Sequence, residues 1–324
     1  MISVNRRAAA IVQQMIEDRE ALGLDVARLQ NGATVLDAGI KVPGSLEAGI
    51  LFASACLGGL GKVSLTQQYF ESRDAGGNFA FSQAAVAVSV NQPWIACMAS
   101  QYAGWAIRLE RYFAIGSGPA RALYAGEGIY GKLGYRDESE TAILMLEGRE
   151  LPGEEVASFV AEKCGIRPAQ LTLLIAPTAS LVGSVQVAAR SAETGLHKLF
   201  ELGFDIRRVI SAFGLCPLAP VAADDLHAIG RTNDAILYGA QVFYSVQADD
   251  GELENLIEKI PSAGARDYGI PFYDLFMRYK GDFYRIDPLL FSPAQVEINN
   301  VNSGRSFRAG HLNPSLIRAL FPES

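Results

Sequence analysis

The sequence has few of the side chains from which metal sites and disulfide frameworks are built. Among its 324 residues there are only three histidines and four cysteines, and no two cysteines have CxxC spacing. The histidines show no ligand spacing and HExxH is absent, so we expect neither a structural nor a catalytic metal. In a chain of this size without a secretory signal, we expect the cysteines to be reduced thiols in a cytoplasm.

Long apolar segments and basic runs are also missing. The longest apolar run, AAVAVSV, is far too short to span a membrane. The formal net charge is −7 and no run of lysine or arginine offers a local basic patch, so we expect no nucleic-acid partner. At the N-terminus, the helical spacing of Ile11, Met15 and Ile16 predicts a first helix instead of a signal peptide.

Three common catalytic motifs are absent or incomplete. No GxSxG elbow occurs, so a serine hydrolase of that type would lack its nucleophile. The glycine-rich stretch CLGGLGKV (56–63) is not a P-loop, because Val63 stands where the Mg²⁺-binding hydroxyl belongs and Cys56 replaces the first glycine. GEGIYG (126–131) matches GxGxxG, but it follows a helical segment where a dinucleotide site requires a strand.

The residues that are present describe a globular enzyme-like chain with many tight turns. It is 49% hydrophobic and 19% charged, with 32 glycines. Strand-like and helical segments alternate, which predicts an α/β (mixed α+β) fold. We expect two α/β domains, about 1–165 and 166–324, with an active-site cleft between them. The expected elements are strands at 34–42, 78–90, 112–118, 140–148 and 171–177, helices at 154–165 and 182–200, a long strand or other element at 232–247 with Gly239 as a bulge, and a β-hairpin at 295–310.

Small-residue elbows between a strand and a helix recur in the chain. In GSGPAR (116–121), Pro119 suits the first helical position, and Ser117 and Gly118 would bring backbone and hydroxyl close to a ligand. Arg121 adds a cation, so this elbow is a candidate phosphate or carboxylate site. The alternative is that it is only a short connection from strand to helix.

Further polar residues lie in apolar surroundings. Asparagine, aspartate and backbone groups supply the paired donors and acceptors that the edge of a heterocycle needs. The alternative is that these residues form turns and helix caps. The candidates for ligand contact are Thr178 and Ser180 in IAPTASLVGSVQV, Asn233 and Asp234 in GRTNDA, and Arg266 and Asp267 in SAGARDYGIPF.

The predicted helix at 182–200 carries an arginine and a glutamate on one stripe. Arg190 and Glu193 are three positions apart, so their side chains can touch. They lie about a quarter-turn from the stripe of small and aliphatic residues that predicts the core face. Periodicity alone favours an ordinary surface ion pair worth about 0.2–0.5 kcal/mol.

Taken together, long stretches of the chain resemble one family, the methenyltetrahydromethanopterin cyclohydrolases. SQYAGW, with Tyr102, resembles the bacterial methylotroph branch, since archaeal members tend to carry lysine there. The matching stretches are ISVN (2–5), NGATVLDAGIKVPGSLEAG (31–49), CLGGLG (56–61), IACMASQYAGW (95–105), YFAIGSGPARAL (112–123), IAPTASLVGSVQVAAR with Glu193 (175–193), GRTNDAILYG (230–239), RDYGIPFYDLF (266–276) and DFYRIDPLLFSPAQV (282–296).

The resemblance implies reversible hydrolysis of N5,N10-methenyltetrahydromethanopterin to the N5-formyl compound in one-carbon metabolism, with a pterin substrate and no further cofactor. It implies that Glu193 activates the water as general base and that Arg190 assists it. Burial would favour the neutral acid, and the adjacent guanidinium would favour the carboxylate. It also implies a homo-oligomer such as a trimer. Two rivals stay open: a methenyl-tetrahydrofolate cyclohydrolase, and a pterin- or phosphate-binding protein without catalysis.

Overall fold

Two six-stranded sheets organise the chain, and the computed structural model describes residues 2–74, 77–281 and 285–321. It divides into two compact units, Met1–Lys62 with Trp94–Gln186, and Val63–Pro93 with Val187–Ser324. The predicted α/β fold class is confirmed, whereas the division expected near residue 165 stays a prediction about folding domains. Residues 282–284, which begin the family-like stretch 282–296, lie outside the described part of the chain.

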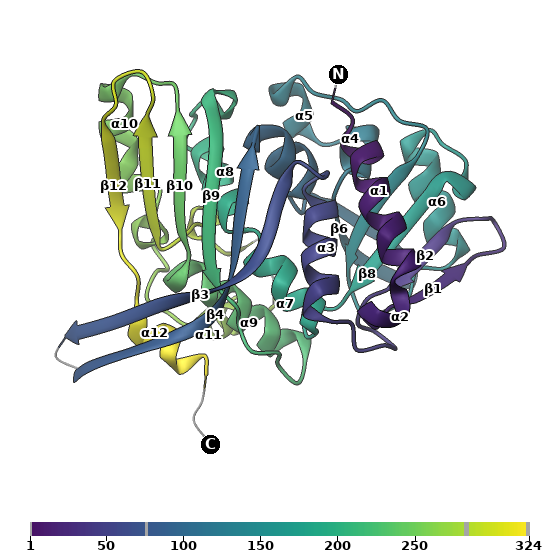
Figure 1. Ribbon diagram of the computed structural model, residues 1–324, viewed down its shortest axis with the longest axis horizontal. Coiled ribbons are helices and arrows are strands. Elements are labelled where there is room, and N and C mark those ends of the chain that lie inside the picture. The colour runs from purple at the N-terminus through teal and green to yellow at the C-terminus, as the bar shows by residue number, and fades with distance from the viewer. Residues whose placement is uncertain (1, 75–76, 282–284, 322–324) are drawn as a thin grey trace. The chain divides into compact units, whose positions relative to one another are not determined.

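The sheet of the first unit has the order β1-β2-β8-β7-β6-β5 (Figure 1). Its central strands β2, β8 and β7 run parallel, and the outer pairs are antiparallel. The strands predicted at 112–118, 140–148 and 171–177 are confirmed, and the strand predicted at 34–42 is present but ends at Asp37. The bounds are β1 Asp25–Arg28, β2 Thr34–Asp37, β5 Trp105–Leu109, β6 Tyr112–Ser117, β7 Ala142–Glu147 and β8 Leu171–Ala176.

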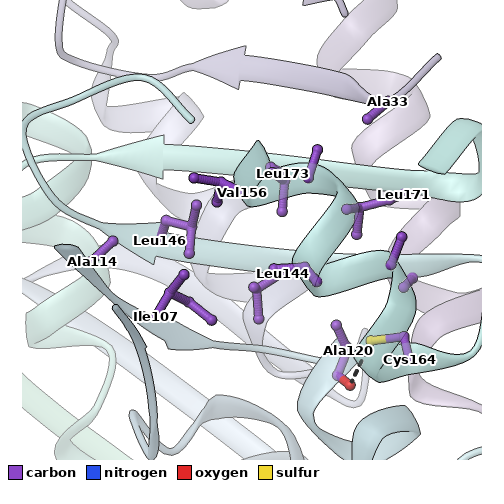
Figure 2. Close-up of a cluster of buried hydrophobic side chains, with 14 of the residues drawn as sticks. Ala33, Ile107, Ala114, Ala120, Leu144, Leu146, Val156, Cys164, Leu171 and Leu173 are labelled. Atoms are coloured by element: carbon purple, nitrogen blue, oxygen red, sulfur yellow. Dashed lines mark hydrogen bonds between the residues drawn. The ribbon is translucent and has the colours of Figure 1, made fainter. Parts of the chain in front are cut away.

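Both faces of this sheet are covered, which is why its parallel strands read as unbroken apolar runs. Leu144 and Leu173 face one core with helices α4 and α6, while Met145 and Leu174 face a second core with α1 and α3. Figure 2 shows the first of these cores, where Cys164 of α6 lies beside Ala120 of α4. The remaining helices of this unit are short and serve to connect the layers. The bounds are α1 Val4–Glu17, α2 Arg19–Leu22, α3 Leu46–Cys56, α4 Ala120–Tyr124, α5 Gly128–Leu133, α6 Glu154–Cys164 and a π-helix Trp94–Gln101.

The sheet of the second unit has the order β12-β11-β10-β9-β4-β3 (Figure 1). The hairpin predicted at 295–310 is confirmed as β11 and β12, and the strand predicted at 78–90 lies within β4. Only β10 and β11 pair in parallel in the registers described. The bounds are β3 Gly61–Asp74, β4 Gly77–Asn91, β9 Val209–Pro217, β10 Gln241–Val246, β11 Gln295–Asn300 and β12 Ser306–Gly310.

The segment 232–247 is a helix followed by a strand, so the long strand with a bulge at Gly239 is wrong. Helix α9 (Asp225–Gly239) is capped by Asp224, whose carboxylate accepts the His227 N–H. The chain becomes extended at Ala240. Aromatic and β-branched residues throughout this stretch suit a strand, but tertiary packing makes its first half helical. The unit also contains α10 Asp250–Leu256, α11 Phe272–Arg278 and α12 Pro314–Ala319, besides α8 (Ser191–Glu201), which is described below. No helix in the described part of the chain is long and apolar enough to cross a membrane.

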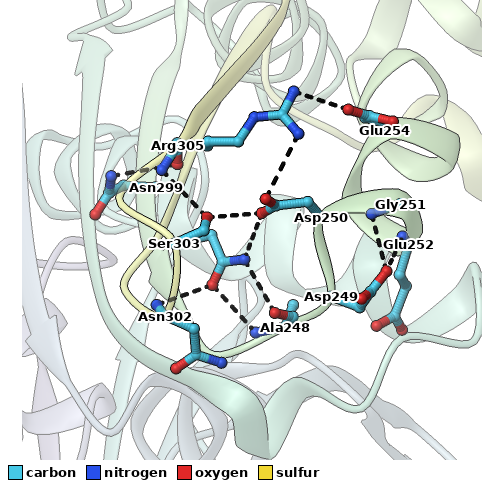
Figure 3. A network of polar contacts seen from close by, with 11 residues as sticks. Ala248, Asp249, Asp250, Gly251, Glu252, Glu254, Asn299, Asn302, Ser303 and Arg305 are labelled. Atoms are coloured by element: carbon cyan, nitrogen blue, oxygen red, sulfur yellow. Dashed lines mark hydrogen bonds and ion pairs between the residues drawn. The ribbon is translucent and has the colours of Figure 1, made fainter.

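A polar network fixes the turn between β11 and β12 against the start of α10 (Figure 3). The Asp250 carboxylate accepts hydrogen bonds from Asn300 Nδ2 at 2.7 Å and Ser303 Oγ at 2.8 Å. Arg305 adds an ion pair with Glu254 at 2.8 Å. The bonds from Ser303 and Asn300 lower the pKa of Asp250. These contacts tie the end of β11 and the turn after it to the first turn of α10.

The helix predicted at 182–200 is in fact two helices. α7 (Leu181–Ala188) ends before Arg190, and α8 (Ser191–Glu201) begins after it. The Arg190 N–H bonds the Val187 carbonyl three residues back at 2.9 Å, which tightens the chain into a turn. The predicted core stripe survives the break because residues on both sides of it are fully buried. Val185, Ala189, Leu196 and Leu199 are all 0% exposed.

Candidate functional site

The start of α8 carries a buried ion pair. The Arg190 Nη1 and Glu193 Oε2 atoms are 3.6 Å apart, and the two side chains are 10% and 6% exposed. An ordinary surface pair would be solvated on most sides, so the surface interpretation of this stripe is wrong. A charged pair withdrawn from water costs desolvation that its own attraction offsets only in part.

The position of Glu193 in the helix favours a charged carboxylate. It is the only acidic residue in the first turn of α8, where the backbone N–H groups and the helix dipole attract negative charge. Arg190 precedes the helix as its N-cap residue and adds a cation on the same side. The local structure therefore holds a buried acidic side chain at a helix N-terminus beside a cation.

In the first unit, a second polar group lies at the carboxyl edge of the parallel strands. Glu147 is the last residue of β7, and its carboxylate accepts hydrogen bonds from Thr178 Oγ1 and, at 3.4 Å, from Gln186 Nε2. Ligands of open α/β sheets bind outside this edge. Glu147 is not among the residues predicted from the sequence, where its only signal is an acidic residue that ends the apolar run 142–147.

Ser180, predicted as a ligand contact, is engaged in capping. Its hydroxyl accepts the Gly183 N–H at 2.9 Å and donates to the Pro177 carbonyl at 2.7 Å, at the start of α7. This is the capping alternative that the sequence left open. Thr178 remains directed at a carboxylate through its bond to Glu147. The structure thus brings Thr178 and Ser180 together but gives them different partners.

The elbow after β6 is built as predicted, with a small shift of its helix start. Ser117 ends the strand, Gly118 has a φ of 98°, and Pro119 precedes the five-residue helix α4 as its N-cap residue. The left-handed φ favours glycine at 118, since a side chain there would be strained. The Ser117 hydroxyl is buried 3.4 Å from the Cys56 sulfur. Contact of Ser117 and Gly118 with a ligand stays a prediction.

Arg121 is the side chain that departs most from its predicted role. It is 0% exposed, and its guanidinium donates to Glu127 at 2.8 and 2.6 Å and to the Ser100 carbonyl at 3.0 Å. The rings of Tyr102 and Tyr130 lie 5.2 and 5.7 Å away. All of these partners are protein groups. Ligand contact by Arg121 therefore stays a prediction that the burial of its guanidinium does not support.

In the second unit, Asp234 clamps one segment of chain onto another. Its Oδ1 atom accepts the Phe272 N–H at 2.8 Å, which ties the start of α11 to α9. Burial raises the pKa of Asp234 to about 7. The neighbouring Asn233 donates to the Ile229 carbonyl at 2.8 Å on its own helix. Their contact with a heterocycle stays a prediction, and the bonds present are those of structural residues.

We expect the Asp234→Asn variant to remove a pH dependence of stability. Because the folded state holds the Asp234 proton up to about pH 7, the free energy of unfolding of the parent falls as pH rises from about 4 to 7. The shift corresponds to a few kcal/mol, on the order of 3. The asparagine oxygen can still accept the Phe272 N–H. The measurement is the free energy of unfolding in urea of the parent and of Asp234→Asn at pH 5 and at pH 8. If the difference between the two proteins is the same at both pH values, the prediction is contradicted.

The last predicted pair, Arg266 and Asp267, forms a half-open ion pair next to that clamp. Arg266 Nη2 lies 3.2 Å from Asp267 Oδ2, and the Tyr279 hydroxyl donates to the same oxygen at 3.1 Å. The hydrogen bond from Arg266 lowers the pKa of Asp267. The Arg266 side chain is 70% exposed while that of Asp267 is 10% exposed. Arg266 is thus a solvent-accessible cation with a fixed partner.

Comparison with known proteins places the whole chain in one group. The profile of the family described as Cyclohydrolase (MCH) matches residues 3–321. A methenyltetrahydromethanopterin cyclohydrolase of Methanocaldococcus jannaschii is 43% identical, with 98% of each chain covered. Proteins of the same name from Methanococcus maripaludis and Methanothermobacter marburgensis are 45% and 42% identical, with 98% and 99% of each chain covered.

Proposed function

Because this chain belongs to the cyclohydrolase (MCH) family and is a hydrolase of that kind, we propose that it hydrolyses N5,N10-methenyltetrahydromethanopterin to N5-formyltetrahydromethanopterin. The observation that carries the proposal is the buried pair of Arg190 and Glu193, which supplies a water-activating carboxylate. The reaction is reversible and belongs to one-carbon metabolism. It needs no cofactor, since the pterin is the substrate.

The substrate's methenyl carbon is already electrophilic, because it lies between two nitrogens that share a positive charge. The Glu193 carboxylate takes a proton from a water as the water oxygen bonds to this carbon. The C–N10 bond of the tetrahedral adduct then breaks, and its electron pair goes to N10, which takes up the proton held by Glu193. The hydroxyl of the adduct releases its proton to solvent and becomes the formyl carbonyl. The carbon remains on N5 as the formyl group.

Arg190 has two roles in this proposal. Its guanidinium, 3.6 Å from Glu193, keeps the carboxylate charged while it is withdrawn from water. It also donates to the oxygen of the tetrahedral adduct as that oxygen gains charge. Residues that hold the pterin are drawn from the remaining candidates, of which Thr178 with Glu147 and Arg266 with Asp267 have the most suitable polar groups.

Oligomeric state, cellular location and family branch are proposed on separate observations. We propose a homo-oligomer, supported by Phe213 and Phe243, which are 44% and 36% exposed on the face of the second sheet opposite α8. A second copy would cover this apolar surface. We propose a cytoplasmic location because the four cysteines are dispersed along the sequence, without CxxC spacing, and are all buried. The bacterial branch rests on Tyr102 alone, and the archaeal sources of the three relatives do not support it.

A direct comparison of substrates tests the function. Purified protein is mixed at neutral pH with methenyltetrahydromethanopterin, and in parallel with methenyl-tetrahydrofolate, while loss of the methenyl absorbance is followed. We expect fast decay of the first substrate only. The two substrates differ in reactivity because the arylamine ring of the folate carries a carbonyl. Fast decay of methenyl-tetrahydrofolate in place of the methanopterin compound would establish the rival cyclohydrolase. Binding by calorimetry with decay no faster than buffer would establish a binding protein.

A further inference from the structure

Helix α8 approaches the second sheet more closely than side chains normally allow. A Cβ atom at Gly195 in α8 would lie 2.3 Å from the Tyr244 hydroxyl oxygen. A Cβ atom at Gly214 in β9 would lie 2.3 Å from Ser191 Oγ and 3.0 Å from the Ala192 nitrogen. The two distances of 2.3 Å are far below van der Waals contact. The two glycines therefore allow the first turn of α8 to rest directly on β9 and β10.

A single tyrosine bonds to this turn from the sheet. Tyr244 of β10 is 0% exposed, and its hydroxyl donates to the Ala192 carbonyl at 2.7 Å. A hydroxyl buried this deeply is costly unless it finds a partner. Ala192 immediately precedes Glu193 in the chain. The bond therefore fixes the peptide group that joins Ala192 to Glu193.

The position of that backbone matters because proton transfer from water requires hydrogen-bond geometry. Misplacement of a reacting group by about 1 Å can cost on the order of a hundredfold in rate. A glutamate has three side-chain torsions, so its carboxylate is placed well only when its backbone and neighbours are fixed. Here the backbone is fixed from the sheet by Tyr244, Gly195 and Gly214.

We propose that Tyr244 is a positioning residue for the hydrolysis, holding the first turn of α8 so that the Glu193 carboxylate meets the attacking water. Gly195 is its necessary partner, because any side chain there would displace either the helix or the tyrosine hydroxyl. This inference rests on the proposed function of Glu193. Through Tyr244 of β10, the second sheet then affects the rate of the chemical step.

The Tyr244→Phe variant tests the role of the hydroxyl. We expect kcat to fall about tenfold with KM unchanged within about twofold, because the reacting group is misplaced while the substrate-holding groups are untouched. The matched control is Tyr135→Phe in the first unit. Tyr135 is also buried and donates to a backbone carbonyl, that of Ile2, at 2.8 Å.

The control separates positioning from stability. Both variants lose one buried hydroxyl bond, so both are expected to lose a similar small part of the free energy of unfolding. Only Tyr244→Phe is expected to lose kcat. Equal effects on kcat in the two variants, or a rise in KM in place of the fall in kcat, would overturn the inference.

A rescue experiment tests the partnership with Gly195. Gly195→Ala alone is expected to lower kcat about a hundredfold, since its methyl group meets the tyrosine hydroxyl. In the double variant Gly195→Ala/Tyr244→Phe the obstructing oxygen is gone, and the Pro293 ring, 3.2 and 3.3 Å from the new Cβ position, has to give by only a few tenths of an ångström. We therefore expect kcat to return to within about threefold of Tyr244→Phe. Additive losses in the double variant would show that the two residues act independently and overturn the pairing.

Parallel assays of Glu193→Gln keep this test separate from that of the function. If Glu193→Gln turns over normally, the base is elsewhere and the proposed mechanism fails, whatever Tyr244 does. If Glu193→Gln is inactive and Tyr244→Phe matches the parent, the mechanism stands and the positioning role is refuted. If both lose kcat in the expected proportions, the positioning role is supported.

Discussion

Glu193→Gln is expected to lose most of its turnover, by about 10²–10⁴-fold in kcat. Glutamine keeps the size of the side chain and can still hydrogen-bond, but it cannot take a proton from water. We therefore expect the fold and KM to stay near those of the parent. The measurement is the initial rate of absorbance loss with saturating methenyltetrahydromethanopterin, together with circular dichroism for the fold.

The same helix offers a matched control. Glu201 is the last residue of α8, with a side chain 40% exposed and paired with His197. Glu201→Gln is expected to retain the kcat of the parent within about twofold, because surface pairs contribute little and Glu201 is given no part in the chemistry. Near-normal turnover in Glu193→Gln would refute the general-base role.

Arg121→Met is expected to destabilise the protein by about 3–5 kcal/mol, because it breaks a buried ion pair from one side. The guanidinium is 0% exposed and donates to Glu127 and to the Ser100 carbonyl. Methionine fills similar space but leaves the Glu127 carboxylate, which is 16% exposed, without its cation. The midpoint of urea unfolding measures the loss.

A second variant shows where that destabilisation comes from. In Arg121→Met/Glu127→Gln the stranded charge is removed, so part of the lost stability should return. The same variants also test the prediction from the sequence that Arg121 contacts the ligand. If Arg121→Met unfolds at the urea concentration of the parent and its KM rises, then Arg121 contacts the ligand and is not a structural residue.

Local pattern was sufficient for most of the elements. The runs 142–147 and 171–176 are apolar without alternation and short, which predicts strands buried on both faces, and both are parallel strands between two helical layers. The hairpin at 295–310 was visible from alternation around a turn. Segment 232–247 was not predictable in the same way, since its composition suits a strand while its first half packs as helix α9.

The site was predictable only where residues three or four apart suffice. Arg190 and Glu193 are neighbours by helical geometry even though the helix is interrupted just before Ser191. Glu147 and Thr178 are 31 positions apart and meet because β7 and β8 are adjacent. The clamp from Asp234 to Phe272 spans 38 positions. No local pattern could have paired these residues.

The order of residues along the chain thus sets the fold class, most strands and the i, i+3 spacing of Arg190 and Glu193, because these depend on contacts between near neighbours. The folded structure alone withdraws Arg190 and Glu193 from water and turns Arg121 inward to Glu127. It also presses α8 onto Tyr244. Burial is a property of packing between distant segments, and it distinguishes these two ion pairs from the solvated pairs that their sequence spacing alone allows.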